Sequence, residues 1–230
     1  MINDISGGLL DDNMLPTVAS LMVPVCLMHY RGDPSSMQSL ANYPSEGVLA
    51  AVEVIDLLPN PSWYTDMHGR SALTYWNAEC TDLPLRFCSC LSSHQEELES
   101  RVAAALKAGI PRWNIIIDPG IGFAKTAEQS FDILRGSRAL TQLCRPWSGE
   151  GNGYAIPGVS SDGFGLLVGA SRKSFIGKAL GESDARSDRR LWGTAAACTA
   201  AVEQGACIVR VHDVSEMHDV ISVADAIYRR

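Results

Sequence analysis

The sequence predicts a parallel α/β fold, and two observations lead to it. Short runs of β-branched and other apolar residues alternate along the chain with stretches whose apolar residues recur at helical spacing. Four of the five apolar runs have no polar alternation, which is typical of strands in a parallel sheet covered on both faces. Repeated strand–helix units of this kind build a sheet whose strands all run in one direction.

Five strands are expected, each ending close to a polar residue. They span residues 2–5, 23–28, 114–117, 166–169 and 207–211. A helix is expected over 95–108, where Leu98, Val102 and Leu106 recur at four-residue spacing, with Ser93 as its N-cap and Gly109 as a stop signal.

Three more helices are expected towards the C-terminus. Thr126 and Gln129 have the spacing of a capping box, which predicts a helix that carries Phe131 and Leu134 on one face. The next has the stripe Leu191, Ala195, Cys198 and Val202 and ends at Gly205. The last is capped by Ser215 and carries Val220, Ile221, Ala224 and Ile227.

Two stretches do not fit the strand–helix pattern of this single domain, which covers residues 1–230. Residues 57–93 contain three of the seven cysteines and two aromatic pairs without a clear period, and we interpret them as an insertion. A retained intron, a lineage-specific surface insertion and a binding element stay open as its origin. Residues 145–165 are rich in Gly, Ser and Pro and are expected to form a surface loop.

Composition excludes several classes of protein. With 46% hydrophobic and 20% charged residues, the chain has the balance of a globular protein rather than a disordered one. Its net charge of −7, without a long basic block, argues against nucleic acid as a partner. No apolar stretch approaches the length of a membrane span, and the N-terminus lacks the pattern of a signal peptide. The seven cysteines are expected to be reduced thiols.

Polar residues gather just after the expected strands, where a parallel α/β fold builds its site. They form five groups: Asn3-Asp4, His29-Tyr30-Arg31, Asp118, Ser171-Arg172-Lys173 and Arg210-Val211-His212-Asp213. A single group of this kind is equally well explained as part of a turn, as a helix cap or as a pair of charged residues on the surface. Five groups at the same end of one sheet exceed chance placement, so we predict a single site there.

The residue types indicate a ligand with two parts. Asn3 and Asp118 offer an amide and a carboxylate, which suit the N–H donors of an aminopyrimidine edge. Lys173, Arg172, Arg210 and His212 supply cations for phosphate or carboxylate oxygens. The glycines of DPGIGF free the backbone to approach a ligand. The site is therefore expected to bind a polar heterocycle that carries an anionic group.

Two neighbouring residues have a plainer interpretation. His29 follows an apolar run and is expected to be a core histidine, while Met28 fits the core and the wall of a site equally well.

No nucleophile elbow, Walker A loop or GxGxxG after a strand is present in the sequence.

The motifs INDISGG, LMHYRGDPSSMQ, IIIDPGIGFAKT, LLVGASRKSFIG and RVHDV occur in the order found in dihydropteroate synthases. The chain resembles the fungal form of this family over residues 1–50 and 94–230. The resemblance implies a (β/α)8 TIM barrel of the pterin-binding type. It also implies condensation of p-aminobenzoate with 6-hydroxymethyl-7,8-dihydropterin pyrophosphate, giving dihydropteroate and pyrophosphate, with Mg²⁺ as cofactor.

The resemblance assigns roles to the residues that match its motifs. Asn3, Asp118 and Lys173 would hold the pterin, and Ile5 and Met28 would line its slot. Phe123, Ser171 and Arg172 would lie on the p-aminobenzoate side. Arg210 and His212 would bind pyrophosphate, and Lys173, Arg210 and His212 are the expected catalytic residues. No metal ligand is expected in this chain, since the family carries it in an earlier loop.

Complete members of the family begin with three further strand–helix units, so the resemblance implies an incomplete barrel here. We expect this chain alone to be weakly active or inactive and to aggregate through unpaired strand edges. A non-catalytic pterin-binding module and a pterin-dependent methyltransferase domain stay open as alternatives. The methyltransferase domain shares the barrel but is expected to lack SRKSFIG.

The resemblance also bears on partners and compartment. The expected partners are the small-molecule substrates, with no nucleic acid and no membrane. The family tends to dimerise through its late helices, here near 191–202 and 220–227, so a homodimer stays open. The cytoplasm is the expected compartment, with the mitochondrion as the alternative.

Overall fold

The computed structural model describes residues 1–32, 36–41, 85–141, 163–181 and 189–229. The chain divides into two compact units, Met1–Asn42 with His94–Arg230, and Tyr43–Ser93. The first unit holds the five described strands. Residues 57–84 of the predicted insertion, and 145–162 of the predicted loop, lie outside the described residues.

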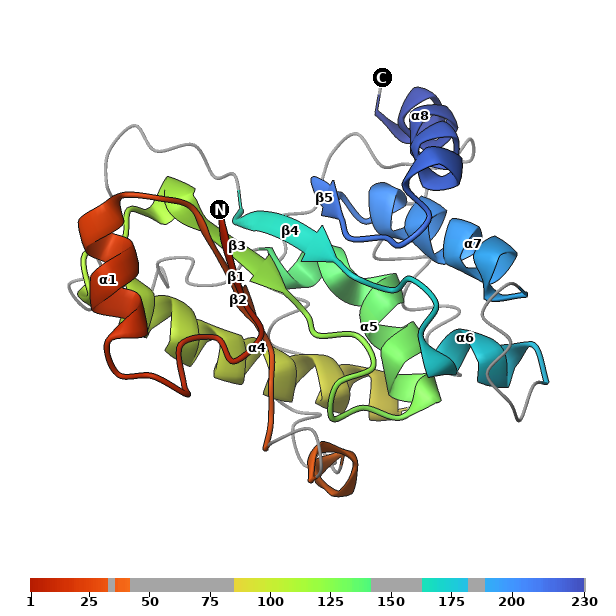
Figure 1. The fold of residues 1–230 in the computed structure, drawn as a ribbon. Coiled ribbons are helices and arrows are strands. Elements are labelled where there is room, and N and C mark those ends of the chain that lie inside the picture. The colour runs from red at the N-terminus through yellow and green to blue at the C-terminus, as the bar shows by residue number, and fades with distance from the viewer. Residues whose placement is uncertain (33–35, 42–84, 142–162, 182–188, 230) are drawn as a thin grey trace, which may run out of the picture. The chain divides into compact units, whose positions relative to one another are not determined.

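A five-stranded parallel sheet forms the centre of the first unit, with its strands in the order β1-β2-β3-β4-β5 (Figure 1). The strands are β1 (Ile2–Asp4), β2 (Val25–Met28), β3 (Ile115–Asp118), β4 (Gly165–Val168) and β5 (Ile208–Val209). Every neighbouring pair is parallel. The spatial order follows the chain order, so each crossover steps to the next strand in the same direction. This is the arrangement found in part of a (β/α) barrel, and it confirms the predicted fold class.

The register of the strands decides which residues share a face of the sheet. Asn3 in β1 pairs with Cys26 in β2, and Met28 in β2 pairs with Asp118 in β3. Paired residues of parallel strands point to the same face, and alternate residues share it. These side chains therefore lie on one face. Leu27 and Ile117, which are paired on the opposite face, are completely buried.

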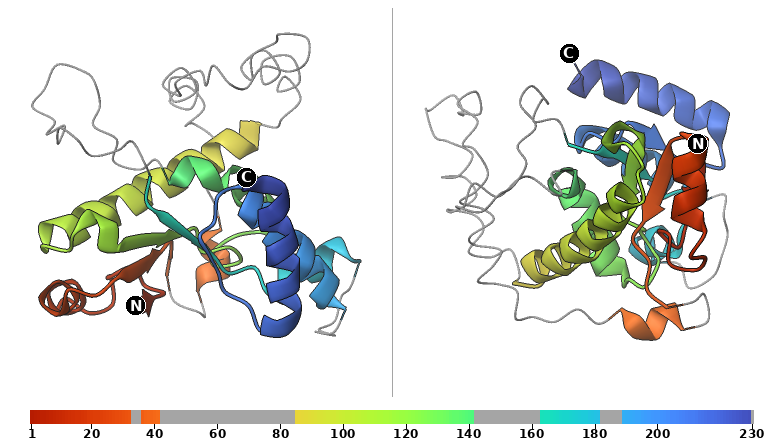
Figure 2. Two further views of the ribbon diagram at one scale, coloured as in Figure 1. Left: turned by 90° about the horizontal axis from the view of Figure 1, so that it is seen from above. Right: turned by 90° about the vertical axis from the view of Figure 1, so that its left-hand side faces the viewer.

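Helices alternate with the strands and cover the core. They are α1 (Met14–Leu21), α4 (Leu85–Lys107), α5 (Ala127–Leu140), α6 (Ser174–Ala179), α7 (Arg190–Glu203) and α8 (Val214–Tyr228). Two short 3-10 helices, η1 (Met37–Leu40) and η3 (Arg112–Asn114), complete the described elements. Helix α5 packs against α6 and α7, and α7 packs against α8 (Figure 2). Their buried apolar residues include Ile133 of α5 and Cys198 of α7.

Of the helix N-caps predicted from the sequence, one is confirmed and two are wrong. The capping box at α5 is present, because Thr126 Oγ1 accepts from the Gln129 backbone N–H and Gln129 Oε1 accepts from the Thr126 N–H. Ser93 is not an N-cap, since α4 begins upstream at Leu85 and runs through it. Ser215 is not one either, because α8 begins at Val214 and places Asp213 at the cap position.

The strand boundaries differ from the predicted ones by one or a few residues. Strand β2 begins at Val25 rather than at residue 23, and Pro24, which has no N–H to donate, precedes it. Asp118 is the last residue of β3 rather than the first residue after it. Leu106, expected on the buried stripe of α4, is 37% exposed, whereas Leu98 and Val102 are buried.

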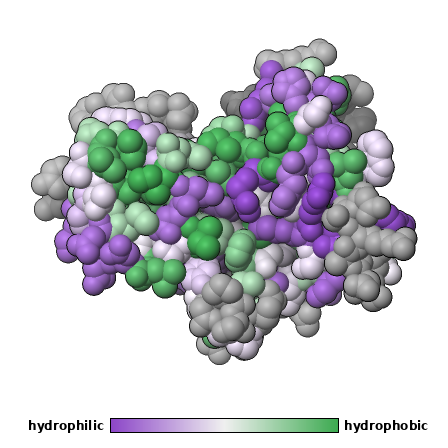
Figure 3. All heavy atoms as spheres, in the orientation of Figure 1, coloured by the Kyte–Doolittle hydropathy of each residue, from purple (hydrophilic) through white to green (hydrophobic). Residues whose placement is uncertain are grey.

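Two helices were not expected from the sequence. Helices α1 and α6 are short, and α6 has only six residues, too few for an apolar period to stand out. Apolar side chains gather over α1 (Figure 3), where Leu21 and Met22 at its end and Leu9 and Leu10 before it are more than half exposed.

Candidate functional site

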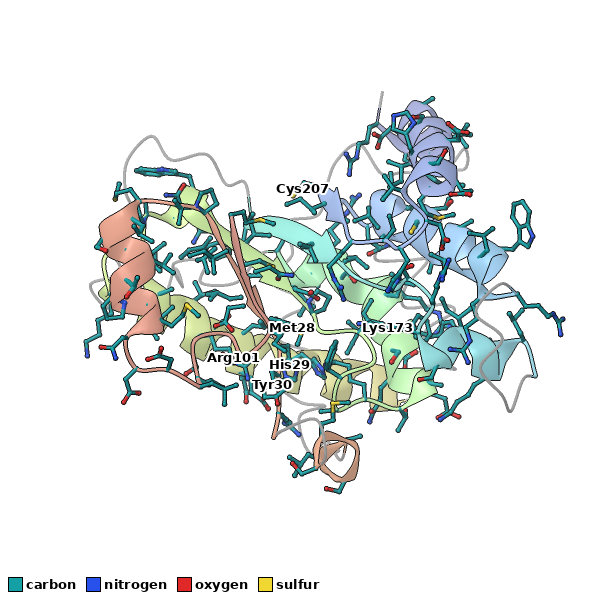
Figure 4. The ribbon with its side chains drawn as sticks, in the orientation of Figure 1. Met28, His29, Tyr30, Arg101, Lys173 and Cys207 are labelled. Carbon is teal, nitrogen blue, oxygen red and sulfur yellow. The ribbon has the colours of Figure 1, made fainter. Side chains whose placement is uncertain are left out.

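All five predicted polar groups lie at the carboxyl ends of the strands. Because the strands are parallel, the loops that follow them meet at one edge of the sheet. Hydrophilic side chains gather on the part of this face where Lys173 lies (Figures 3 and 4). The structure brings some members of these groups into direct contact and leaves others apart.

Asp118 is the buried carboxylate of the site, with 5% of the residue exposed. Its Oδ1 accepts a hydrogen bond from the backbone N–H of Gly120 over 2.7 Å. Burial raises the pKa of Asp118 above its ordinary value, and the Gly120 hydrogen bond and the charges of Lys173, Lys125 and Arg210 oppose this. A carboxylate held in this way can accept N–H donors from a ligand without first giving up a shell of water.

The turn that follows Asp118 depends on two glycines with positive φ. A Cβ on Gly120 would lie 2.1 Å from the backbone oxygen of His29, so no side chain fits there. A Cβ on Gly122 would lie 3.1 Å from Cδ of Lys173. The two glycines therefore let the turn approach β2 on one side and the Lys173 side chain on the other, as DPGIGF suggested.

Lys173 lies at the N-cap position of α6 and reaches across to this turn (Figure 4). Its ammonium donates to the backbone oxygen of Ile121 and lies 4.5 Å from the centre of the Phe123 ring. Burial lowers the pKa of Lys173 to about 8; the carboxylate of Asp118 works in the opposite direction, and Arg210 works in the same direction. Asp118, Phe123 and Lys173 thus form one cluster, with the lysine still protonated at neutral pH.

The loop after β4 is joined to the loop after β5 by two side-chain pairs. Ser171 Oγ accepts from the backbone N–H of His212 over 3.1 Å and lies 2.9 Å from its Nδ1. Arg172 donates from Nε and Nη2 to the two carboxylate oxygens of Asp213. Hydrogen bonding and the charge of Arg172 hold the pKa of Asp213 below its ordinary value.

Arg172 has positive φ, and its backbone is held in place by two residues of the α7 region. Its N–H donates to Thr194 Oγ1 over 3.1 Å, and its carbonyl accepts from Arg190 Nη1 over 3.0 Å. Its φ of 57° is unusual for a residue with a side chain. The pair with Asp213 neutralises the guanidinium that was expected to face p-aminobenzoate.

Arg210 and His212 follow β5, and both are exposed. The guanidinium of Arg210 lies over Gly169, where a Cβ would be 3.3 Å from Nε. Its charge acts on both Asp118 and Lys173, so it belongs to the same electrostatic environment. An exposed arginine and histidine beside this cluster can contact the oxygens of an anion.

Of the other residues expected on the pterin side, Met28 lies beside the turn, whereas Asn3 and Ile5 are exposed on the first strand and the loop after it. Met28 is 2% exposed and borders the turn, because a Cβ on Gly120 would lie 3.2 Å from its Cγ. Asn3 and Ile5 are exposed, and within the described part of the chain the Asn3 side chain has no hydrogen-bond partner. The structure therefore places Met28 at the site, and does not bring Asn3 into contact with Asp118 or Lys173.

Asp4, the other acidic residue after β1, has a local role. Its carboxylate accepts from the N–H and Oγ of Ser6 and from the N–H of Gly8 over 2.6–3.0 Å. This side chain therefore fixes the loop after β1, as Asp residues commonly do in turns.

A buried polar cluster beside the turn was missed from the sequence, apart from its histidine. His29 is completely buried, as expected of a core histidine, and Lys125 is 3% exposed. Lys125 Nζ lies 3.1 Å from His29 Nδ1, and His29 Nε2 lies 3.0 Å from Glu97 Oε2. Arg101 of α4 donates to the backbone oxygens of Met28 and Tyr30. Only the position of Lys125 after DPGIGFA could have drawn attention to it.

The described part of the chain contains neither a cluster of metal ligands nor a membrane-spanning helix. In the ranges that the structure describes, no three His, Cys, Asp or Glu side chains gather where they could hold a metal ion. No helix there is long and apolar enough to cross a membrane. Cys26, Cys198 and Cys207 are free thiols.

A parallel barrel-type sheet with a buried carboxylate, a lysine and exposed cations at its carboxyl edge belongs to the class of α/β proteins that bind a polar, anionic ligand at the ends of their strands. The family model described as "Pterin binding enzyme" matches residues 1–57 and 86–212. The chain belongs to this family. The match leaves uncovered residues 58–85, which lie within the stretch interpreted as an insertion, and residues 213–230.

Relatives with assigned names extend over the whole chain. The chain is 36% identical over 227 residues to the folic acid synthesis protein fol1 of Schizosaccharomyces pombe, covering 99% of this chain and 23% of that protein. It is 35% identical over 229 residues to the dihydropteroate synthase of Synechocystis, covering 100% of this chain and 57% of that protein. The chain thus spans less than two thirds of these relatives.

Solved structures of dihydropteroate synthases have the same fold. The enzyme of Stenotrophomonas maltophilia, with imidazole in its active site, has a TM-score of 0.66 at 28% identity, covering 100% of this chain and 62% of that one. The enzyme of Xanthomonas albilineans in complex with 7,8-dihydropteroate has a TM-score of 0.63 at 26% identity, covering 100% of this chain and 60% of that one.

Proposed function

We propose that this chain carries the pterin-binding and pyrophosphate-binding part of a dihydropteroate synthase. The reaction condenses p-aminobenzoate with 6-hydroxymethyl-7,8-dihydropterin pyrophosphate and gives dihydropteroate and pyrophosphate. The observation that carries the proposal is the cluster of Asp118, Lys173 and Phe123 around one glycine-dependent turn. A buried carboxylate, an ammonium and an aromatic ring suit a flat heterocycle with N–H donors and ring acceptors.

Each residue of the cluster, and each residue predicted around it, has a proposed role in binding the substrates. Asp118 accepts from the amino edge of the pterin, and Lys173, protonated at neutral pH, donates to its acceptors. Met28 and Ile5 line the pterin slot, and Asn3 completes its polar edge. Phe123 and Ser171 lie on the p-aminobenzoate side, together with Arg172, whose pairing with Asp213 fixes its place.

The exposed cations act on the leaving group. The bond that breaks joins the pterin methylene carbon to a pyrophosphate oxygen, and the bond that forms joins this carbon to the amine nitrogen. The amine then loses a proton to water. Arg210 and His212 stabilise the negative charge that develops on pyrophosphate. Asp118 provides an anionic environment for the positive charge that develops on the pterin side.

Mg²⁺ is part of the proposal only as a partner of the pyrophosphate. It would supply positive charge to the leaving group. The described residues offer no cluster of three or more ligands for it.

A comparison of binding with turnover tests the proposed function. Calorimetry with the pterin pyrophosphate and chromatography of dihydropteroate are carried out on the full polypeptide that the gene encodes and on this chain alone. The proposal expects binding by both and turnover by the full polypeptide. Binding without turnover by either would favour a non-catalytic module, and transfer of a methyl group to or from a pterin would favour a methyltransferase domain.

Helices α7 and α8 each carry large apolar side chains that are exposed. We propose a homodimer through α7 and α8, where Trp192 is 77% exposed and Val223 and Ile227 are 61% and 60% exposed. Sedimentation of the full polypeptide at several concentrations tests this. The cytoplasm remains the proposed compartment, although a relative in Arabidopsis thaliana is named as a mitochondrial bifunctional protein.

A further inference from the structure

Lys125 is a buried cation that the proposed reaction does not use. It ends the turn after Asp118 and is 3% exposed. Its ammonium donates to the backbone oxygen of Phe123 over 2.8 Å and to Nδ1 of His29 over 3.1 Å. Burial of an ammonium is costly unless its hydrogen bonds are satisfied. These two hydrogen bonds tie the Lys125 side chain to the backbone of the turn and to His29 after β2.

His29 extends this interaction to α4. Because its Nδ1 accepts from Lys125, its proton lies on Nε2, which is 3.0 Å from Oε2 of Glu97. Burial and the charges of Lys125, Arg101 and Arg31 lower the pKa of His29 well below its ordinary value, so the imidazole is neutral. A neutral ring therefore lies between the carboxylate of Glu97 and the ammonium of Lys125, close to both.

The segment that Lys125 holds has little regular structure of its own. Gly120, Gly122 and Ala124 all have positive φ, which is an unfavourable conformation for Ala124. One backbone hydrogen bond, from the Phe123 N–H to the Gly120 oxygen over 3.0 Å, closes the turn. The bond from Lys125 to the Phe123 oxygen therefore adds a fixed point.

The same turn determines where Lys173 lies. The ammonium of Lys173 donates to the Ile121 oxygen and lies against the Phe123 ring. A displacement of the turn would move both of these partners and expose the lysine to water. Figure 4 shows His29 near the end of β2 and Lys173 on the other side of the turn, so the two ends of the connection come from distant parts of the chain.

We propose that Lys125 is a positioning residue, which acts with His29 and Glu97 to fix the Gly120–Phe123 turn and, through it, Lys173. This inference rests on the proposed function, in which Phe123 and Lys173 contact the two substrates. It assigns a role to three side chains that touch neither substrate. The role is to hold the turn in the conformation that the pterin and p-aminobenzoate require.

The first test uses Lys125→Met in the full polypeptide that the gene encodes. The pKa of Lys173 is measured without ligand, by competitive labelling of lysines across a pH series and mass spectrometry. It is expected to rise from about 8 towards its ordinary value of 10.5. The KM for p-aminobenzoate is expected to rise about tenfold. A variant that only loses folded protein would show a lower kcat with unchanged KM.

A second variant separates positioning from direct charge effects. Lys125→Met removes a positive charge, which by itself also raises the pKa of Lys173. Glu97→Gln removes a negative charge, which by itself would lower that pKa, whereas a loosened turn raises it. Glu97→Gln keeps the shape of a half-buried helical residue, and it also weakens the ion pair in which Arg31 donates to Oε1 of Glu97. Its matched control is Glu96→Gln on the exposed face of the same helix.

The outcomes distinguish this inference from the proposed function. A rise of the Lys173 pKa in Glu97→Gln but not in Glu96→Gln, with a higher KM for p-aminobenzoate, supports positioning. An unchanged or lower pKa in Glu97→Gln overturns it, and so does a raised pKa with unchanged KM. If the wild-type protein does not turn over these substrates, the proposed function fails, while the Lys173 pKa still decides whether the cluster fixes the turn.

Discussion

Arg172 and Asp213 form a bidentate ion pair that joins the loop after β4 to the loop after β5. The N–H of Arg172 is also held by Thr194, and the adjacent Ser171 is bonded to His212. The p-aminobenzoate side of the proposed site and its pyrophosphate side are therefore joined by direct side-chain bonds.

Loss of this ion pair is expected to affect p-aminobenzoate more than the pterin. In Asp213→Asn the charge that orients the guanidinium is removed while the shape is kept. We expect the KM for p-aminobenzoate to rise about three- to tenfold, with a smaller change in kcat. Steady-state kinetics with each substrate varied in turn measures both constants.

The control for this substitution is Asp219→Asn. Asp219 lies on α8 with its side chain 88% exposed. Surface carboxylates of this kind contribute little to binding or stability. An equal change of KM in both variants would show that the net charge of the region, and not the pair with Arg172, is responsible.

Gly122 and Gly109 offer a matched pair of substitutions. Both have positive φ, of 80° and 93°, so alanine at either position is expected to cost about 1 kcal/mol of stability. A Cβ on Gly122 would press on Lys173 at 3.1 Å, whereas a Cβ on Gly109 would meet nothing within 4 Å. Gly122→Ala is therefore expected to lose about tenfold or more in kcat/KM, and Gly109→Ala is not.

Urea unfolding and kinetics of the two glycine variants check this together. Similar midpoints with different activities are the expected result, since the backbone strain is shared and the contact with Lys173 is not. If Gly109→Ala lost as much activity as Gly122→Ala, the cause would be backbone strain alone. The close approach of the lysine to the turn would then have no functional importance.

Local signals in the sequence predicted local structure well. The capping box of α5 needs only Thr126 and Gln129, three residues apart, and it is present. The β3 strand was visible from its apolar run and ends in the predicted acidic residue, Asp118. The edge at which the polar groups gather followed from the parallel direction of the strands alone.

Contacts between distant residues could not be predicted in the same way. Lys125 is ordinary in sequence, and its partner His29 lies 96 positions away. Asp213 was expected only as a member of the polar group after the last strand, and the structure pairs it with Arg172, 41 positions earlier. Ser93 has the features of an N-cap, yet the helix continues through it. In each case the tertiary partner or the preceding segment, which no local pattern encodes, decides the outcome.

The pH dependence of activity is expected to show an alkaline limb from Lys173. Its ammonium form donates to the turn and, in the proposed function, to the pterin. Because burial lowers the pKa of this lysine to about 8, kcat/KM is expected to fall as the pH rises through that value. Lys173→Arg keeps the positive charge at all these pH values, so any activity that it retains should lack this limb.

The acidic side of the same profile depends on Asp118. Its pKa is raised, so the ionised carboxylate is lost at a higher pH than for an ordinary aspartate. Asp118→Asn keeps an oxygen that can accept from the Gly120 N–H, and is expected to fold. Calorimetry should show pterin binding weakened at least about tenfold, because a charge-assisted hydrogen bond is lost. Binding that stays unchanged would remove Asp118 from the proposed site.

Lys173 is expected to lower the free energy of unfolding, although its ammonium is part of the proposed site. Its pKa is about 8 in the folded protein against 10.5 when unperturbed, so below pH 8 both states are protonated and the folded state bears the burial penalty in full. The difference corresponds to roughly 3 kcal/mol, as an order of magnitude. Between pH 8 and 10.5 the unfolded state binds more protons, so the free energy of unfolding should rise with pH in this range.

Lys173→Met tests this directly. At pH 7 we expect the free energy of unfolding of the variant to exceed that of the wild type by about 1–3 kcal/mol, less whatever the bond to Ile121 and the contact with Phe123 contribute. The advantage should shrink between pH 8 and 10, because the wild type sheds its proton there and the variant has none to lose. Urea unfolding at pH 7 and 9.5 measures the difference, and comparison with Lys178→Met, an exposed lysine on the same helix, cancels general effects of alkali. If Lys173→Met is less stable than the wild type at pH 7, the contacts of the lysine stabilise the fold by more than the burial of its charge destabilises it. The buried charge would then not lower the free energy of unfolding.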